Sequence, residues 1–219
     1  DAAIKRGNLE CLKKTCEKYG DGMRCADIVA TAAGYGQLEC LKYLYENWDF
    51  RDSMICTWAA QRNQLECLKY LHENGCEWDA TTCCEATFNG HLRCLKYAHE
   101  NGCEWDETTT EAAAENNKLK CLKYAHKNGC KWNEKAMEQA VENNNVECLK
   151  YLYEQGCPFD IKKLRGIDTL SECGKYITDV ICDEEYSKII EYEENEENEE
   201  EDEETRFVRF LIKIEMQTL

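Results

Sequence analysis

The chain has 219 residues and a hydrophobic fraction of 43%, which is enough to bury a continuous core. Its formal net charge is −17 at pH 7. Residues 191–204 hold eleven acidic groups and no basic ones, whereas the other 205 residues carry only −6. This balance argues against a nucleic-acid-binding protein, which needs a basic face, and without a run of 18 or more apolar residues we expect no membrane-spanning helix.

One short phrase recurs six times along the chain. It reads Glu-Cys-Leu-Lys at 10–13, 39–42, 66–69 and 147–150, Arg-Cys-Leu-Lys at 93–96 and Lys-Cys-Leu-Lys at 120–123. The first spacing is 29 residues and the next four are 27 each. A fixed period of this length predicts a stacked array, in which each unit buries its apolar face against its neighbours.

The unit at 81–107 shows the expected elements most clearly. The sequence predicts a short helix over 82–88, a turn at Asn89-Gly90 and a second helix over 91–100. Gly102 stands where a left-handed residue would end the second helix, and Asp106 is placed to cap the next first helix. No segment of the array alternates with the period of a strand, so the predicted fold class is all-α.

The two ends of the array depart from this pattern. Residues 2–7 fit only the end of a first helix, so we expect the chain to begin inside a repeat, with residues before it missing. At the other end, Glu172-Cys173-Gly174-Lys175 echoes the repeated phrase, with Gly174 in place of the core leucine. The predicted organisation is about six repeats in 1–160, a degenerate seventh repeat or cap in 161–190, an acidic disordered linker in 191–205 and an apolar segment in 206–219.

Residues 89–103, from the turn through the second helix, resemble the ankyrin repeat, and residues 112–117 resemble its first helix and turn. The usual ankyrin period is about 33 residues. The shortfall lies after the second helix, so the resemblance implies a helix-turn-helix solenoid with shortened connecting loops. This short variety is similar to arrays encoded by giant DNA viruses and by some protists and algae. The resemblance covers about residues 1–160 and implies binding of a protein partner rather than catalysis.

The 17 cysteines and four histidines could suggest a chemical site. However, ten of the cysteines occupy two repeat positions, where a thiol behaves as a small buried hydrophobe. Three histidines (His72, His99 and His126) share one repeat position, and five residues along a helix turn His99 away from Cys94. We therefore expect surface histidines, no metal, no cofactor and no catalytic residues, in a protein from a reducing compartment, the cytoplasm or the nucleus.

Two aromatic series recur with the repeat. Trp78, Trp105, Trp132 and Phe159 are expected in the core between repeats, because they match the apolar position after the glycine stop. A second series lies on the second helices, and its hydroxyl groups are expected to face water. It consists of Tyr43, Tyr70, Tyr97, Tyr124 and Tyr151.

Partner contacts are expected where the repeats differ, since packing constrains the other positions. Three variable positions lie on the first helix, and in ankyrin repeats the two before the turn face the concave groove. The candidate partner-binding residues are Tyr35, Trp58, Gln61, Arg62, Glu85, Phe88, Asn89, Glu115, Asn116, Glu142 and Asn143. Aromatic residues and arginine are the usual anchors of interfaces.

The sequence therefore predicts a monomeric, non-catalytic scaffold that binds a partner protein, with no nucleic acid and no membrane as partner. The acidic linker suggests docking of a partner with a basic surface, or only a solvated spacer. Two alternatives stay open: an adaptor that recruits substrates for ubiquitin ligation, for which 161–190 show no convincing motif, and a structural component that assembles through 206–219.

Overall fold

The computed structural model describes residues 2–19, 25–48, 52–160 and 170–182. The chain divides into two compact units, Asp1–Lys163 and Leu164–Leu219, and each unit is described by itself. The predicted acidic linker (191–205) and apolar segment (206–219) lie outside the described residues.

The first unit is built from pairs of short helices. In chain order these are α1 (Ala2–Lys5), α2 (Leu9–Tyr19), α3 (Cys25–Gly34), α4 (Leu38–Asn47), α5 (Ser53–Gln61), α6 (Leu65–Glu73), α7 (Ala80–Phe88), α8 (Leu92–Glu100), α9 (Glu107–Glu115), α10 (Leu119–Lys127), α11 (Glu134–Glu142) and α12 (Val146–Glu154). The described residues contain no strand, which confirms the all-α prediction. None of the described helices is long and apolar enough to cross a membrane.

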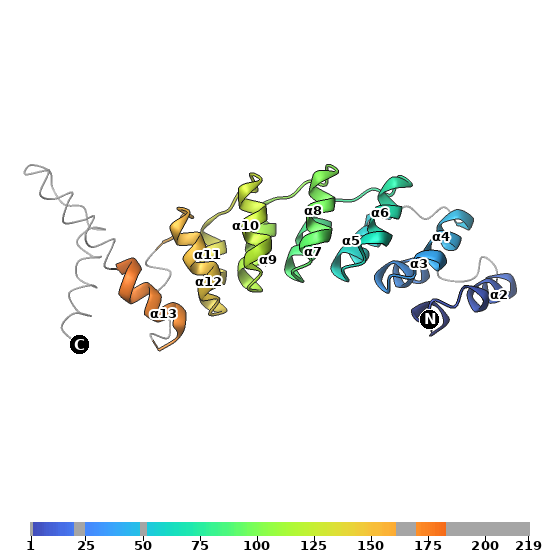
Figure 1. The fold of residues 1–219 in the computed structure, drawn as a ribbon, viewed down its shortest axis with the longest axis horizontal. Coiled ribbons are helices and arrows are strands. Elements are labelled where there is room, and N and C mark those ends of the chain that lie inside the picture. The colour runs from blue at the N-terminus through green and yellow to red at the C-terminus, as the bar shows by residue number, and fades with distance from the viewer. Residues whose placement is uncertain (1, 20–24, 49–51, 161–169, 183–219) are drawn as a thin grey trace, which may run out of the picture. The chain divides into compact units, whose positions relative to one another are not determined.

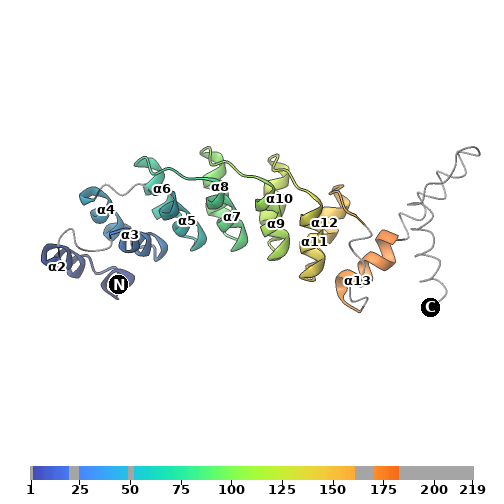
Figure 2. The same cartoon turned by 180° about the vertical axis from the view of Figure 1, so that it is seen from behind.

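Each helix pair packs on the pairs that neighbour it in the chain. Within a pair the odd-numbered first helix contacts the even-numbered second helix, and first helices contact first helices of neighbouring pairs. The second helices form a parallel but sparser series of contacts. Figures 1 and 2 show these pairs side by side in chain order within the first unit. The arrangement is the predicted repeat solenoid.

Short polar side chains set where the first helices begin. Asp106 adopts an extended conformation before α9, and its carboxylate accepts a hydrogen bond of 3.0 Å from the backbone N–H of Thr108. Asp52, Asp79 and Asn133 cap α5, α7 and α11 in the same way. The predicted cap is therefore confirmed. The predicted boundaries were slightly wrong, because α7 begins at Ala80 and His91 is the residue before α8.

Left-handed residues follow most of the described helices of the array. Gly102 has a φ of 84° after α8, as predicted. Between the helices of a pair the left-handed position is held by glycine or asparagine: Gly90 has a φ of 77° and Asn117 a φ of 55°. Asparagine tolerates this conformation better than other residues with a Cβ, so the two residue types can exchange at this turn.

The repeated cysteines are packing residues, with one exception. The repeated cysteines of α4, α6, α8, α10 and α12 are buried, and the thiol of Cys94 lies 3.7 Å from the side-chain oxygen of Asn63 in the preceding turn. Cys11 of α2 is exposed, so the expectation of burial is wrong there. Burial at this position depends on a preceding pair, and α1 and α2 have none within the described residues.

One side-chain position joins some helix pairs to the pair before them. At Gln37 and Asn145 the residue that precedes the second helix donates to carbonyl groups at the end of the previous first helix. Asn145, which is buried, donates hydrogen bonds of 2.7 Å to the Ala114 carbonyl and 2.8 Å to the Glu115 carbonyl. Gln37 donates in the same way to the Lys5 carbonyl at 3.1 Å. These bonds satisfy carbonyl groups that have no partner within their own helix.

The described part of the second unit is short. Helix α13 (Glu172–Tyr176) is followed by a π-helical segment, Ile177–Cys182. The Ser171 hydroxyl accepts a hydrogen bond of 3.0 Å from the N–H of Gly174, which caps α13. The rest of the predicted cap, 161–169 and 183–190, lies outside the described residues.

Replacing Asn145 with alanine should destabilise the array, because the buried Ala114 carbonyl and the partly buried Glu115 carbonyl lose their donor. We expect a loss of about 1–3 kcal/mol in the free energy of unfolding, measured by urea titration with far-ultraviolet circular dichroism. Gln64→Ala is the matched control, since Gln64 occupies the same position but donates to the exposed Arg62 carbonyl. Equal losses in the two variants would contradict the assigned role of Asn145.

Candidate functional site

Three exposed aromatic side chains lie on successive first helices. Tyr35 directly follows α3, Trp58 lies on α5 and Phe88 ends α7. Their exposed fractions are 41%, 38% and 42%, although each is a large hydrophobic side chain. Most large apolar side chains of the first unit are buried, so these three mark an unusual surface rather than incomplete packing.

Two cations lie over these aromatic rings. The Arg62 guanidinium carbon is 5.4 Å from the centre of the Tyr35 ring and 5.9 Å from that of Trp58. Lys5 ends α1, and its ammonium group lies 5.4 Å from the centre of the Tyr35 ring. These four residues are called the cation–aromatic cluster below. Within the described residues neither Lys5 nor Arg62 forms an ion pair, so both charges are open to an anionic group of a partner.

Gly34 leaves space inside the cation–aromatic cluster. A Cβ atom at Gly34 would lie 3.7 Å from Trp58 Cε3 and 3.8 Å from Arg62 Cγ. These are ordinary van der Waals distances, so a side chain here would cover part of the exposed face of Trp58 and Arg62. The small residue at this variable position therefore keeps the cluster accessible.

Two of the predicted contact residues bind each other. The Gln61 amide donates a hydrogen bond of 2.8 Å to the Glu85 carboxylate, which links α5 to α7. Both side chains are half-buried. This bond holds neighbouring first helices together at the edge of the exposed aromatic surface.

The three asparagines among the candidates end their own helices. Each side-chain amide donates to the carbonyl group four residues earlier. Asn89 bonds the Glu85 carbonyl at 2.9 Å, Asn116 the Ala112 carbonyl at 3.0 Å and Asn143 the Gln139 carbonyl at 3.0 Å. A local role therefore accounts for asparagine at this position, and the structure supplies no separate reason to assign it to a partner.

The first helices toward α11 carry a different surface. Glu115 ends α9 and Glu142 ends α11, and both side chains are exposed. Gln139 donates a hydrogen bond of 3.2 Å to Glu142. The exposed candidate residues thus change along the array, from Tyr35, Trp58, Arg62 and Phe88 next to or on α3, α5 and α7 to Glu115 and Glu142 on α9 and α11.

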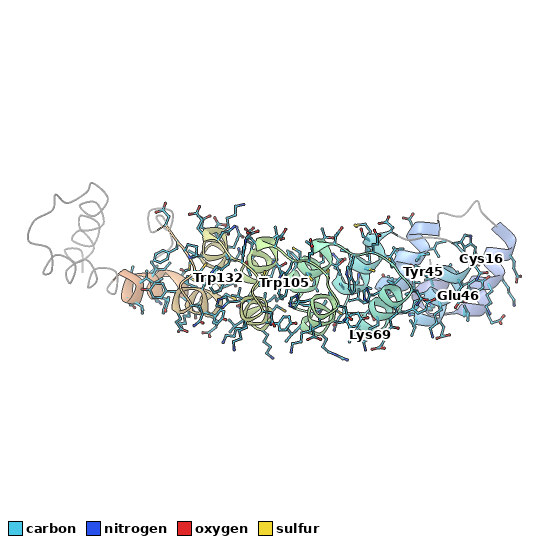
Figure 3. The ribbon with its side chains drawn as sticks, turned by 90° about the horizontal axis from the view of Figure 1, so that it is seen from above. Cys16, Tyr45, Glu46, Lys69, Trp105 and Trp132 are labelled. Carbon is cyan, nitrogen blue, oxygen red and sulfur yellow. The ribbon has the colours of Figure 1, made fainter. Side chains whose placement is uncertain are left out.

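The three repeated histidines are half-buried at the surface and stack on tryptophans, which the sequence did not predict. His99 stacks on Trp105 with ring centres 3.6 Å apart and an angle of 10° between the planes. Both rings meet Tyr124 of the next pair edge-on, at 6.0 Å. The same triplet recurs around His72 and His126. Figure 3 shows Trp105 and Trp132, one from each of two successive triplets.

These triplets correct two further expectations. Trp78, Trp105 and Trp132 do join neighbouring repeats, but they are half-buried rather than part of the inner core. The tyrosine hydroxyl groups do not all face water, because Tyr151 is buried and its hydroxyl lies 2.9 Å from His126 Nδ1. A flat ring stacked on tryptophan keeps its ring edge available for such a bond.

Thiol chemistry is suppressed through most of the array. Burial raises the pKa of the Cys67, Cys94 and Cys121 thiols to about 11 and that of Cys130 and Cys157 to about 12. The reactive thiolate is therefore scarce at neutral pH. Among the described residues no group of three or more histidine, cysteine or acidic side chains could hold a metal ion.

Sequence reasoning missed Lys5 as a member of the cation–aromatic cluster. Its position matches Gly34 only if the longer first spacing of 29 residues is taken into account. Repeat alignment could have supplied the position, but not the placement of Lys5 and Arg62, from the two pairs on either side, over the same Tyr35 ring. That requires the distance between α1, α3 and α5.

Comparison with known proteins supports the repeat assignment. The family model for ankyrin repeats (3 copies) matches residues 1–82 and 83–163. A solved structure, the human ASB11 ankyrin repeat domain, is similar with a TM-score of 0.64 and 19% sequence identity over 80% of this chain and 93% of that chain. At this identity the likeness shows the fold alone. No curated protein matches the chain.

Two tryptophan variants should distinguish a residue that stabilises the array by packing between repeats from one that lies exposed on its surface. Trp105→Ala removes a stack and an inter-repeat contact, so we expect a loss of about 2–3 kcal/mol in the free energy of unfolding, below the value for a fully buried tryptophan. Trp58→Ala removes an exposed ring and should cost less than about 1 kcal/mol. Urea titration measures both free energies of unfolding. An equal loss in the two variants would contradict the assignment of Trp105 to inter-repeat packing and of Trp58 to the exposed surface.

Stability should fall in mild acid through His126. Burial, and to a smaller extent the Lys127 charge, lower the pKa of His126 in the folded chain. The unfolded chain therefore binds the proton more readily, so this contribution is complete above the ordinary histidine pKa and is lost as the pH falls below it. Urea titrations at about pH 7.5 and about pH 5.5 should show a smaller difference for His126→Gln than for the unaltered chain. An unchanged difference would contradict this role.

Proposed function

Because the chain belongs to the ankyrin-repeat family, we propose that it is a non-catalytic scaffold that binds a partner protein through its first helices. Ankyrin-repeat domains are generally protein–protein interaction scaffolds, and the family is typically non-catalytic. The observation that carries the proposal is the run of exposed aromatic side chains, Tyr35, Trp58 and Phe88, on three successive first helices.

The packing of the helices favours this side of the array over the other. First helices contact one another more extensively than second helices do. Closer packing along one side would bend a solenoid toward that side, so the first helices would line a concave face. Aromatic and arginine side chains on such a face are the residue types that contribute most to binding energy.

The cation–aromatic cluster is the proposed centre of the interface. Trp58 and Tyr35 offer apolar area at a small entropic cost, and Arg62 offers a planar donor for a carboxylate or a backbone carbonyl. Glu115 and Glu142 would form the polar edge toward α11 and would favour basic groups of the same partner. A protein rather than a small ligand fits this surface because the residues are spread over several helices.

We also propose a cellular compartment and an oligomeric state for the protein. Cysteines fill the described core as thiols, which suits a reducing compartment such as the cytoplasm or nucleus. A repeat array closes its core through its own neighbours, and a monomer is the proposed state. The adaptor and assembly hypotheses depend on 161–190 and 206–219, and no observation on the described residues favours either.

The test begins with proximity labelling to identify a partner, followed by affinity measurement on the purified pair. The triple variant Trp58→Ala, Arg62→Ala and Phe88→Ala should weaken binding by about 30-fold or more, since hot-spot residues contribute at least about 2 kcal/mol. The helical circular dichroism should stay intact, because all three side chains are exposed.

The matched control alters exposed residues on the second helices, namely Arg93→Ala combined with Lys120→Ala. We expect this variant to bind as the unaltered chain does. If the triple variant binds normally, or if the control loses binding to the same extent, the first-helix interface is wrong.

A further inference from the structure

The second helices change in charge along the array. Helices α4, α6 and α12 each carry one lysine and two glutamates, which gives a net charge of −1 with histidine neutral. Helix α8 carries an arginine, a lysine and a glutamate, a net charge of +1, and α10 carries three lysines and no acidic residue, a net charge of +3. Because the chain as a whole has a net charge of −17, these two neighbouring helices form an unusual basic region.

The change in charge arises mainly at the first position of the repeated phrase. In α4, α6 and α12 this position holds glutamate, and its carboxylate pairs with the lysine three residues later. The three ion pairs are Glu39–Lys42 at 2.9 Å, Glu66–Lys69 at 3.1 Å and Glu147–Lys150 at 3.5 Å. The same position is Arg93 in α8 and Lys120 in α10. Two neighbouring repeats therefore hold two like charges where three other repeats hold an ion pair.

Five basic side chains of α8 and α10 are exposed, and we call them the basic patch. They are Arg93, Lys96, Lys120, Lys123 and Lys127. Within the part of the chain that the structure describes, none of the five forms an ion pair. Helix α8 contacts α10, and the three lysines of α10 are spaced by three and four residues, which places them on one side of that helix. The patch thus presents several uncompensated positive charges close together.

Aromatic rings of the following helix pair hold two of these lysines. The Lys96 ammonium lies 5.3 Å from the centre of the Tyr124 ring, and the Lys123 ammonium lies 5.2 Å from the centre of the Tyr151 ring. A ring face attracts a cation without neutralising its charge. The two lysines are therefore positioned by the array and keep a full charge for another anionic group.

The stability of the helices does not account for the basic patch. Opposite charges three residues apart stabilise a helix, whereas like charges at this spacing destabilise it. Glutamate at the position of Arg93 and Lys120 is compatible with the fold, because α4, α6 and α12 carry it. The basic residues of α8 and α10 thus forgo an available ion pair, and a ligand with several negative charges would supply the missing partners.

We propose that the basic patch binds an acidic peptide segment of a second partner protein, distinct from the partner of the first helices. Its carboxylates would pair with Arg93 and with the lysines of α8 and α10. The extent of the patch favours a short acidic segment over a nucleic acid or an anionic membrane. On one side α6 carries the Glu66–Lys69 pair and on the other α12 carries Glu147–Lys150, so a longer polyanion would meet glutamates at both edges. The net charge of the chain also repels extended polyanions.

The test titrates the purified full chain against a fluorescent polyglutamate peptide of about ten residues and follows its anisotropy. We expect binding at about 50 mM salt that weakens by about fivefold or more at about 300 mM, because salt screens exposed charges. A polyglutamine peptide of the same length should not bind. Equal binding of the two peptides would overturn the proposal, as would tighter binding of a single-stranded oligonucleotide of similar length.

The decisive variant restores the glutamate of the other repeats, as Arg93→Glu combined with Lys120→Glu. We expect it to weaken polyglutamate binding by about tenfold or more, since it introduces repulsion and offers carboxylates to Lys96 and Lys123. Its urea midpoint should not fall, because it recreates the ion pairs of α6 and α12. The reverse change, Glu66→Arg, should strengthen binding by about twofold, because it extends the patch to α6.

Two controls separate this surface from general charge effects and from the first-helix interface. Lys135→Glu with Lys175→Glu makes the same change in net charge on α11 and α13, and it should bind polyglutamate as the unaltered chain does. The triple variant Trp58→Ala, Arg62→Ala and Phe88→Ala should also keep this binding, so either interface can fail without the other. An equal loss in the Lys135 and Lys175 variant would overturn the basic patch as the binding site.

Discussion

None of the helix pairs that the structure describes can bury its apolar face by itself, and the rest of the array depends on that constraint. A pair of helices of about nine residues each has too little interior to fold by itself. Its core is completed only when neighbouring first helices and second helices cover it. Cys11 is exposed because no described helix pair precedes it, whereas the cysteine at the same position is buried wherever a described pair does.

This dependence divides the residues of a repeat into two kinds. Positions that touch the neighbouring pair keep similar residues, such as the leucines and cysteines of the second helices and the capping residues before the first helices. Positions that face away from the neighbours can change without cost to the core. The exposed aromatic residues and Arg62 occupy positions of the second kind, which is why a binding surface can differ along the array while the fold stays constant.

Residue types that usually signal chemistry serve mainly as packing material here. Histidines stack on tryptophans, and most repeated thiols point at carbonyl or amide oxygens within the array. Burial of the thiols raises their pKa, so little of the nucleophilic thiolate is present at neutral pH.

The sequence by itself determined the period, the two helices of each repeat, the capping role of Asp106 and the left-handed stop at Gly102. These features follow from local spacing and backbone preference, which a repeated sequence states many times. Only the tertiary structure decided that His99 stacks on Trp105, that Lys5 and Arg62 share the Tyr35 ring, and that Asn145 reaches the Ala114 carbonyl. Each of these contacts depends on the distance and direction between groups from different segments of the chain. Periodicity places a residue on a helix, but it does not specify which neighbour its side chain touches.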